Sequence, residues 1–435
     1  MWKRKSFPPQ ARNFFHPSKP AVLWDKLTFS TVSTDTTTNT TIKKVFSCNL
    51  RLRRVRRERK KEMIFTCDRQ KLNEAVSTVA RAAAPKSSLP ALEGILLEAE
   101  GNKITLSAYD LEIAVTVTIP ATVEAEGSIV MPAKLFGDIV RKLPNTDIKV
   151  VTDEKFHTKI TGGNVKFTIL GMSSVEYPDL PGCVDGDELV LEGTVFRNLL
   201  KQTVFASAET DERPILQGIL FDIDTKAQIV RGVAVDGVRL AVRNEKYVSF
   251  KGETTKFVIP RKTVMELLKN IPDETDMVVN ISVSHKHIIF RMEEMVLTSR
   301  RLQGEFLNYK NAIPTQHSFS LVVDKRLFAS SIERAALLVS PTLRIPIRCT
   351  FDYNMIRLST ATNMGMFHDE FEVAPFQNTL EVGFNHKLML DALSACEDSE
   401  VKIELGGATT PIVLRPVDGD DFIFLVLPMR LSNEE

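Results

Sequence analysis

Two short groups of side chains in the sequence could bind a metal ion. His285 and His287 are two residues apart in SHKH, a spacing that would place both on one face of a strand. No carboxylate or cysteine stands at ligand spacing beside them, which disfavours a metal site. Asp418, Asp420 and Asp421 form the second group, in DGDD. Acidic residues around a glycine between two apolar runs are more typical of a hairpin turn than of a cation site.

The sequence lacks the common signatures of catalysis and cofactor binding. It contains no G-x-x-x-x-G-K-[ST], no G-x-G-x-x-G and no G-x-S-x-G. Its five cysteines form no C-x-x-C pair and have no regular spacing, which argues against a zinc site or a disulfide framework and favours a reducing cytoplasm. No apolar run approaches the roughly 20 residues that cross a bilayer. We therefore expect no cofactor, no metal and no membrane span.

Charge is divided unevenly along the chain. Residues 1–62 contain 16 Lys and Arg against 4 Asp and Glu, whereas the remainder has 40 basic and 51 acidic residues, a net charge of −11. A body this acidic is not a general nucleic-acid binder. Any contact with a polyanion must be confined to a local surface where the basic residues are segregated.

Residues 1–62 differ from the rest of the chain. They lack a sustained hydrophobic period and contain STVSTDTTTNTT followed by RLRRVRRERKKE. Three interpretations are open: a disordered basic arm, an organelle transit peptide, or a translated leader upstream of the true start. We favour the leader, because the codons for Arg-Arg-Glu-Arg-Lys-Lys-Glu can be almost wholly purine, as in a bacterial ribosome-binding stretch, and Met63 follows at once.

From Met63 onward the sequence repeats itself three times, a feature that decides the fold class. Residues 89–116 resemble residues 213–242. A second marker, which consists of a β-branched run, a break and an amphipathic helix, occurs at 129–144, 257–272 and, more loosely, 380–395. A further helix opens each unit, at 68–83, 194–208 and 324–338.

Each unit of roughly 125 residues contains two helices and about eight strands, with turn signals such as TGGN between strands. This order predicts α+β domains in which helices lie on one side of antiparallel sheets. The predicted boundaries are 63–185, 186–314 and 315–435, preceded by the extension 1–62.

The predicted helices have basic solvent faces, while the strands and loops hold the negative excess. Lys and Arg are common on any helix, but a basic face repeated in an acidic body also suggests that all the helices face one polyanion. Among these basic residues are Arg141, Lys142, Arg197, Lys201, Arg261 and Lys262.

The three copies, the segments VDGVRLAV and FVIPRK, the GFN before the last helix and the terminal LPMRL together resemble the bacterial DNA polymerase III beta subunits, the sliding clamps. The resemblance covers 63–435, and residues 1–62 have no counterpart in it. It implies three tandem clamp domains per chain and a ring-forming head-to-tail homodimer, with helices around a central hole and sheets outside. It further implies a non-catalytic processivity factor that encircles duplex DNA of any sequence in the bacterial cytoplasm, at the nucleoid.

The family resemblance also implies an apolar groove between the second and third domains. Its partners would be the DNA polymerase III alpha subunit, the clamp loader, other DNA polymerases and mismatch-repair proteins. A preformed concave apolar site suits the Leu or Phe anchors of a short peptide, and Met429 adds an adaptable surface. The matching residues here are Leu216, Val235, Gly237, Val238, Arg239, Leu240, Leu307, Asn311, Ala312, Leu343, Asn385, Leu388, Thr409, Pro411, Leu425, Val426, Leu427, Pro428, Met429, Arg430 and Leu431.

Two further surfaces follow from the same resemblance. At the dimer interface, edge strands of the first and third domains would pair, and Phe167 would meet Leu337 and Leu338 of the other protomer; the alternative is that all three are ordinary core. Toward DNA, Lys86 and Arg213 join Arg261 and Lys262 as candidate phosphate contacts.

This sequence departs from the family at several of these positions. Val238 and Leu388 stand where some members have His and Tyr, and Leu307 stands where Pro is common, so we expect a more apolar groove. Pro214 and Ile215 replace aromatic residues of some relatives, which argues against base stacking there. The alternative to a clamp is a non-ring repeat scaffold, or a hydrolase with a site assembled from distant residues; either predicts a monomer.

Overall fold

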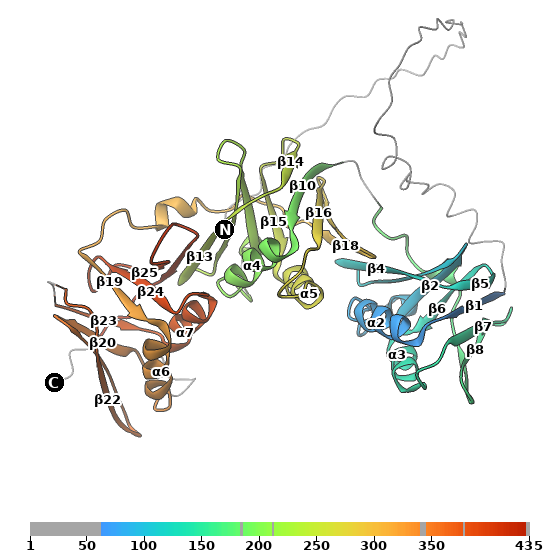
Figure 1. Ribbon diagram of the computed structural model, residues 1–435, viewed down its shortest axis with the longest axis horizontal. Coiled ribbons are helices and arrows are strands. Elements are labelled where there is room, and N and C mark those ends of the chain that lie inside the picture. Colours follow the sequence, from blue (N-terminus) through green and yellow to red (C-terminus); the bar gives the residue numbers. More distant parts are fainter. Residues whose placement is uncertain (1–61, 183–185, 211–212, 340–344, 377–378, 432–435) are drawn as a thin grey trace, which may run out of the picture. The chain divides into compact units, whose positions relative to one another are not determined.

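The computed structural model describes residues 62–182, 186–210, 213–339, 345–376 and 379–431. One arrangement occurs three times along these residues, each time with two α-helices and eight or nine strands (Figure 1). The predicted α+β class with three tandem domains is thus confirmed. The three interpretations of the N-terminal extension concern residues 1–62. Of these, residues 1–61 lie outside the described ranges, and Glu62 is the first described residue.

Repeat 1 comprises β1 to β9 with helices α2 and α3. Strands from both halves of this repeat form a five-stranded sheet in the order β5-β1-β7-β8-β9. The bounds are β1 Met63–Cys67, α2 Arg69–Ala80, η1 Pro90–Glu93, β2 Gly94–Glu100, β3 Lys103–Tyr109, β4 Ile113–Pro120, β5 Thr122–Ala125, β6 Gly127–Pro132, α3 Ala133–Lys142, β7 Ile148–Thr152, β8 His157–Gly162, β9 Val165–Leu170 and η2 Ser174–Glu176.

Repeat 2 comprises β10 to β18 with α4 and α5. The bounds are β10 Asp187–Glu192, α4 Gly193–Val204, η3 Pro214–Leu216, β11 Gly218–Asp224, β12 Ile229–Val235, β13 Arg239–Lys246, β14 Ser249–Lys251, β15 Lys256–Pro260, α5 Arg261–Asn270, β16 Val278–Val283, β17 His287–Met292 and β18 Met295–Arg300. The short helix η4 Tyr309–Ala312 lies on the connection to repeat 3.

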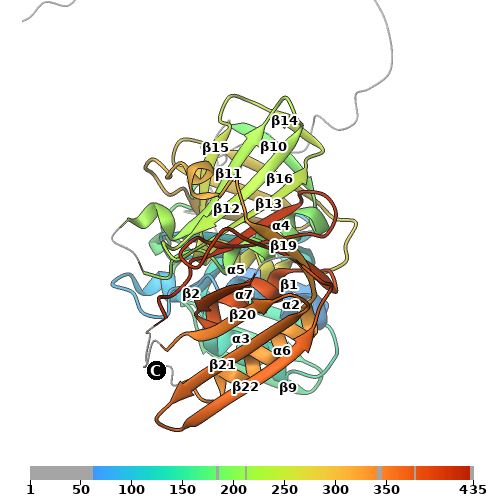
Figure 2. The same ribbon diagram turned by 90° about the vertical axis from the view of Figure 1, so that its left-hand side faces the viewer.

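Repeat 3 comprises β19 to β26 with α6 and α7, and Figure 2 shows its strands β20, β21 and β22 side by side. The bounds are β19 Phe319–Asp324, α6 Lys325–Ala336, β20 Ile347–Asp352, β21 Met355–Thr362, β22 Gly365–Glu372, β23 Leu380–Phe384, α7 His386–Ala395, β24 Glu400–Leu405, β25 Ile412–Arg415 and β26 Phe422–Val426. The short sheet of this repeat has the order β22-β21-β20-β23.

Three of the six described α-helices begin at a residue whose side chain caps them. The Asp68 carboxylate accepts a hydrogen bond from the Lys71 amide at the start of α2, and Asp324 does the same at the start of α6. Asn385 accepts from two amides of α7. Helices α3 and α5 instead begin directly after Pro132 and Pro260, because proline holds φ near the helical value and stands where its missing N–H is not needed.

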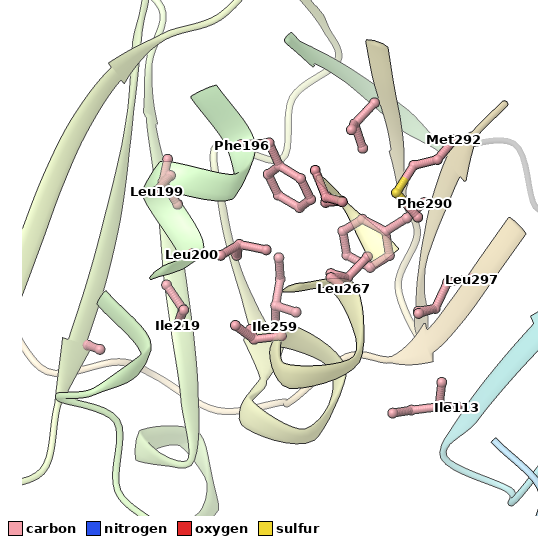
Figure 3. Close-up of a cluster of buried hydrophobic side chains, with 14 of the residues drawn as sticks. Ile113, Phe196, Leu199, Leu200, Ile219, Ile259, Leu267, Phe290, Met292 and Leu297 are labelled. Atoms are coloured by element: carbon pink, nitrogen blue, oxygen red, sulfur yellow. The ribbon is translucent and has the colours of Figure 1, made fainter. Parts of the chain in front are cut away.

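A buried apolar core lies between the helix pair and the sheets of each repeat. Figure 3 shows this core in repeat 2, where the rings of Phe196 (α4) and Phe290 (β17) stack with centroids 5.9 Å apart. Leu297 of β18 and Ile113 of β4 lie in the same buried cluster. The core therefore continues from one repeat into the next.

Strand pairing joins the repeats. The last strand of repeat 2, β18, pairs antiparallel with β4 of repeat 1, and Leu297 lies opposite Val115. The last strand of repeat 3, β26, pairs in the same way with β13 of repeat 2, and Phe424 lies opposite Ala241. At both junctions, the last strand of one repeat pairs with the fourth strand of the preceding repeat. The last strand of repeat 1, β9, and the fourth strand of repeat 3, β22, have no such partner within the chain, and both are edge strands of their sheets.

Both candidate metal groups lie at turns. The expectation that His285 and His287 share a strand face is wrong, because β16 ends at Val283 and β17 begins at His287. Ser284 closes the turn, since its hydroxyl accepts from the His287 amide and its amide donates to the His287 carbonyl. Residues 416–421, which include DGDD, connect β25 to β26 as predicted.

Within the described ranges, no group of three or more His, Cys, Asp or Glu is placed to hold a metal ion. Over the same residues, no helix combines the length and the apolar character that a membrane span requires.

Candidate partner groove and basic surface

The C-terminal tail is tied down beyond its last strand. After β26 the Leu427 amide donates to the Val238 carbonyl at 2.9 Å, and the Met429 amide donates to the Gly383 carbonyl at 2.7 Å. Gly383 allows this approach, because a Cβ there would lie 2.7 Å from the Met429 carbonyl oxygen and 2.7 Å from Leu431 Cδ2. The tail therefore runs from repeat 2 across the β23 strand of repeat 3 instead of fraying.

A separate buried cluster, here called the junction cluster, gathers many of the predicted groove residues. Leu216, Val235, Leu240 and Leu425 belong to it, and Leu307 of the connection packs against it. Its buried members are Ala208, Ile215, Leu216, Leu220, Val233, Val235, Leu240, Val242, Val258, Tyr309 and Leu425. Because Ile215 is buried here, its side chain is unavailable for stacking on a base.

Apolar side chains remain exposed beside this cluster. Val238 is 45% exposed and Leu427 is 38% exposed, and the Leu427–Val238 backbone bond places them side by side. Pro428, Met429 and Leu431 are half-buried, and Arg430 is exposed. These side chains form a surface to which an apolar ligand could bind.

A tight turn presents Val238. The Asp236 carboxylate accepts hydrogen bonds from the Val238 and Arg239 amides at 3.1 and 3.0 Å. Gly237, between them, has φ +91°, a conformation that glycine adopts without strain.

Arg239 links repeat 2 to repeat 3. Its guanidinium contacts Asp236 at 2.7 Å and Asp391 of α7 at 2.6 Å, and it lies over the Phe205 ring at 5.6 Å. With 12% of its side chain exposed, this predicted groove residue is mostly occupied by structural contacts.

The remaining predicted groove residues vary in exposure. Val426 is buried in β26, whereas Asn311, Ala312 and Thr409 are exposed. Half-buried positions are Pro411, Leu388, and Asn385, which caps α7. Leu343 lies outside the described residues.

The junction between repeats 1 and 2 has the same backbone plan with different side chains. The Arg300 amide donates to the Glu112 carbonyl at 3.0 Å, just as Leu427 donates to Val238. Glu112 and Arg300 thus occupy the positions of the exposed apolar pair. Lys262 contacts Asp110 and Glu112, each at 2.7 Å. Burial opposes the charge of Lys262, but these carboxylates prevail and raise the pKa of the ammonium group.

The eight predicted DNA-facing residues divide into two groups. Lys86, Arg141, Lys142, Lys201 and Arg213 are exposed, and Arg141 pairs with Asp138 on its own helix. Arg197 and Arg261 are half-buried and Lys262 is exposed, and all three make internal contacts that compete with a phosphate.

Arg197 and Arg261 cap each other's helices. Arg197 of α4 donates to the Leu268 and Ile271 carbonyls at the end of α5, both at 2.6 Å, and contacts Asp273 at 2.6 Å. Arg261 of α5 donates to the Val204 carbonyl at the end of α4 at 2.5 Å. Cations at helix C-termini satisfy orphan carbonyls and offset the negative end of the dipole.

The other repeats use the first of these caps. In repeat 3, Lys325 of α6 donates to the Cys396 carbonyl after α7 at 2.7 Å. In repeat 1, Arg69 of α2 donates to the Val140 and Arg141 carbonyls of α3. Part of the basic character of these helices is thus explained by helix pairing.

One predicted dimer residue lies on the free edge strand β9, and the other two follow α6, whose Arg334 contacts Asp369 of the free edge strand β22. Phe167 of β9 is 37% exposed, and Leu337 at the end of α6 is 81% exposed. Leu338 beside it is half-buried. None of the three lies among the buried side chains of the core.

Sequence reasoning missed several residues of the site. Asp236 and Asp391 hold Arg239, and Gly383 receives the tail. Asp236 could have been found, because it matches Asp110 in the repeat. Gly383 belongs to the GFN segment before the last helix, but nothing local showed that it receives the tail, and Asp391 had no signal, since the partners of both are distant in the sequence.

Three copies of one α+β domain, joined strand to strand, with basic helices and an apolar surface at one junction, define the DNA-clamp class of protein. The N-terminal, central and C-terminal domains of the DNA polymerase III beta subunit match residues 63–181, 190–308 and 310–430. The chain therefore belongs to the DNA polymerase III beta subunit family.

Individual relatives agree with this assignment. The beta sliding clamp of Staphylococcus epidermidis is 32% identical over 378 residues, which span 85% of this chain and 99% of the relative. The solved sliding clamp of Bacillus subtilis is 27% identical with a TM-score of 0.82, over 85% of this chain and 100% of that one. The Bartonella birtlesii clamp, solved bound to griselimycin, is 28% identical with a TM-score of 0.80 over the same shares.

Proposed function

We propose that this chain is the processivity clamp of a bacterial DNA polymerase III. Two copies join head to tail into a ring that encircles duplex DNA of any sequence and tethers the polymerase. Family membership supports the clamp function. The free edges of repeats 1 and 3 are the observation that best supports the ring.

The registers of the strand pairs show that Phe167, Leu297 and Phe424 are equivalent residues on the last strands of repeats 1, 2 and 3. Leu297 and Phe424 are both 0% exposed, because each is covered by the neighbouring repeat, whereas Phe167 is 37% exposed. Val115 and Ala241, which lie opposite the buried pair, correspond to Phe367 on the free edge strand β22. Pairing of β9 with β22 of a second copy would therefore set Phe167 opposite Phe367 of the partner subunit.

The helix ends lead to the same interface. Phe205 follows α4 and packs edge-on against Phe424, with ring centroids 5.3 Å apart. Leu337 follows α6 at the corresponding place, so it would contact Phe167 of the partner subunit. A pocket of about 300 Å³ beside Phe167, lined by Asp138, Ile139, Arg141 and Lys142, has room for it. Such a head-to-tail interface is heterologous, and the three-domain repeat supplies the rotation that closes it into a ring.

DNA contact in this proposal comes from exposed cations on and near the helices. Lys86, Arg141, Lys142, Lys201 and Arg213 would meet phosphates without reading base edges, as sliding requires. The acidic remainder of the body discourages binding of DNA elsewhere on the surface. This role needs no catalytic site.

The apolar surface around Val238 and Leu427 is the proposed groove for partner peptides. Its partners are the DNA polymerase III alpha subunit, the clamp loader, other DNA polymerases and mismatch-repair proteins. The place of action is the cytoplasm at the nucleoid. We further propose the domain boundaries 63–185, 186–314 and 315–435.

Sedimentation equilibrium and electron microscopy of the full chain test the ring. We expect a dimer whose particles have a central hole wide enough for a duplex. A monomer without a hole would contradict the clamp and favour a non-ring scaffold.

A further inference from the structure

One buried side chain attaches the connection between repeats 2 and 3 to repeat 2. The described residues 303–318 contain no strand, and their one helical turn is η4. Tyr309 is the buried residue of η4, at 4% exposure, and its ring lies in the junction cluster. Lys310, Asn311 and Ala312 are exposed. The position of this turn therefore depends on how Tyr309 is held.

Tyr309 is held by a buried carboxylate. Its hydroxyl donates to Asp222 Oδ2 of β11 at 2.9 Å, and Asp222 is 6% exposed. The second partner of Asp222 is the exposed Lys256, whose ammonium lies 3.9 Å away. A carboxylate this deeply buried requires hydrogen-bond donors. Burial and the charge of Asp222 also raise the pKa of Tyr309, so the hydroxyl keeps its proton and remains a donor at neutral pH.

The anchor is connected to the predicted groove through the backbone. The Tyr309 amide donates to the Leu307 carbonyl at 2.8 Å, and Leu307 packs against the junction cluster. The Asn311 amide donates to the Asn308 carbonyl at 3.2 Å. Fixing Tyr309 therefore fixes Leu307 on one side of it and Asn311 and Ala312 on the other.

We propose that Tyr309 is a positioning residue for partner binding. Together with Asp222 it holds the connection as a preformed wall of the groove, so that a peptide need not order this segment when it binds. The inference rests on the proposed function, since it names a residue that acts through Leu307, Asn311 and Ala312 of the same groove.

The test measures binding of a labelled peptide from a DNA polymerase III alpha subunit to the full chain by fluorescence anisotropy. Tyr309→Phe keeps the ring and removes the donor, and we expect roughly five- to tenfold weaker binding, mostly through faster dissociation. Asp222→Asn keeps a carbonyl acceptor for the Tyr309 hydroxyl, so the affinity of this single variant should stay within about twofold of wild type. Asp222→Leu should weaken binding as much as Tyr309→Phe, and combining the two should add little.

Tyr247→Phe is the matched control, because it removes the hydroxyl of a half-buried ring that packs on Phe250 elsewhere in repeat 2. It should leave peptide affinity unchanged. Hydrogen exchange gives a second readout: amides of residues 307–312 should exchange faster in Tyr309→Phe than in Tyr247→Phe. Tyr309→Phe also leaves the buried Asp222 carboxylate without its donor and should lower the melting temperature, so it is the local exchange that identifies the positioning role. A purely structural role would lower the melting temperature without this local change.

The outcomes separate the two proposals. If wild type binds the peptide and Tyr309→Phe binds equally well with unchanged exchange at 307–312, the positioning role is overturned and the clamp proposal stands. If wild type binds no such peptide, the groove itself is overturned, and the role of Tyr309 in partner binding falls with it.

Discussion

The two junctions between repeats within the chain have the same backbone arrangement and differ in the side chains at the tip of one hairpin. At both, an aspartate accepts hydrogen bonds from two amides of the turn: Asp110 between repeats 1 and 2, and Asp236 between repeats 2 and 3. At the first, the exposed positions are Glu112 and Arg300, with Lys262 bound to the acids. At the second they are Val238 and Leu427.

This difference shows how a repeat protein can acquire one binding site. Strand pairing, the continuous core and partly buried ion pairs such as Arg239–Asp391 join the repeats, so the exposed side chains at the hairpin tip are free to vary. At the first junction the charged residues pair with one another, as Lys262 does with Asp110 and Glu112. At the second junction the apolar residues remain exposed and form a surface to which partners can bind. The free edges β9 and β22 would form a third junction between two copies.

The largest effect is expected at this third junction. Leu337→Glu would bury a carboxylate beside Asp138 and Phe167 of the partner subunit, and should weaken the dimer at least about a hundredfold. Leu337→Arg is the matched variant, because Arg81 takes the same place at the first junction and contacts Glu266 at 2.5 Å. Sedimentation velocity should rank wild type above Arg and Arg above Glu. Equal loss with Arg and Glu would contradict the mapping of one junction onto another.

Converting the second junction into a copy of the first should abolish the groove. Val238→Glu with Leu427→Arg should weaken binding of a polymerase-derived peptide roughly thirtyfold, because apolar anchors lose their contacts, while the dimer stays intact. The reverse pair, Glu112→Val with Arg300→Leu, should leave one peptide bound per chain. Calorimetric titration gives both affinity and stoichiometry, and unchanged affinity in the first variant would locate the groove elsewhere.

The ion pairs that span the junctions should differ in strength. Arg239→Gln removes mostly buried contacts with Asp236 and Asp391 and should lower the free energy of unfolding by about 2 kcal/mol. Arg81→Gln, at a more exposed pair with Glu266, should cost about 1 kcal/mol or less. Urea unfolding measures both, and a larger loss for Arg81→Gln would reverse the expected order.

The smallest effect separates the two groups of cations. Arg141→Gln with Lys142→Gln should weaken binding to short linear duplexes about threefold and reduce its salt dependence, with a smaller loss of stability than Arg197→Gln because both side chains are exposed. Arg197→Gln should lower the melting temperature, because the end of α5 loses its cap, and should change DNA affinity less. The opposite pattern would show that Arg197 faces DNA.

Much of the fold could be predicted from the sequence because it is repeated. Periodic apolar residues marked all six described α-helices, since this signal is local and recurs in every repeat, and prolines marked the starts of α3 and α5. The terminal apolar run also indicated an anchored tail, and the structure brings it to Val238 and Gly383.

What could not be predicted depends on partners far apart in the chain. The solvent face of a helix can be predicted from the sequence. The hydrogen bonds of Arg197 to carbonyls of α5 and the ion pairs of Lys262 with carboxylates of repeat 1 cannot. The turn at His285 was missed because a two-residue spacing fits a strand equally well, until Ser284 is seen to close it. Tyr309 was missed because an isolated tyrosine in a connection gives no periodic signal.

Retention on DNA tests encirclement most directly. The dimer is loaded onto circular duplex DNA with a clamp loader, and its release is followed in high salt before and after the circle is cut once. The account predicts that the protein stays on the intact circle in high salt and leaves at once when the DNA becomes linear. Release from intact circles on addition of salt, at the same rate as from linear DNA, would contradict it.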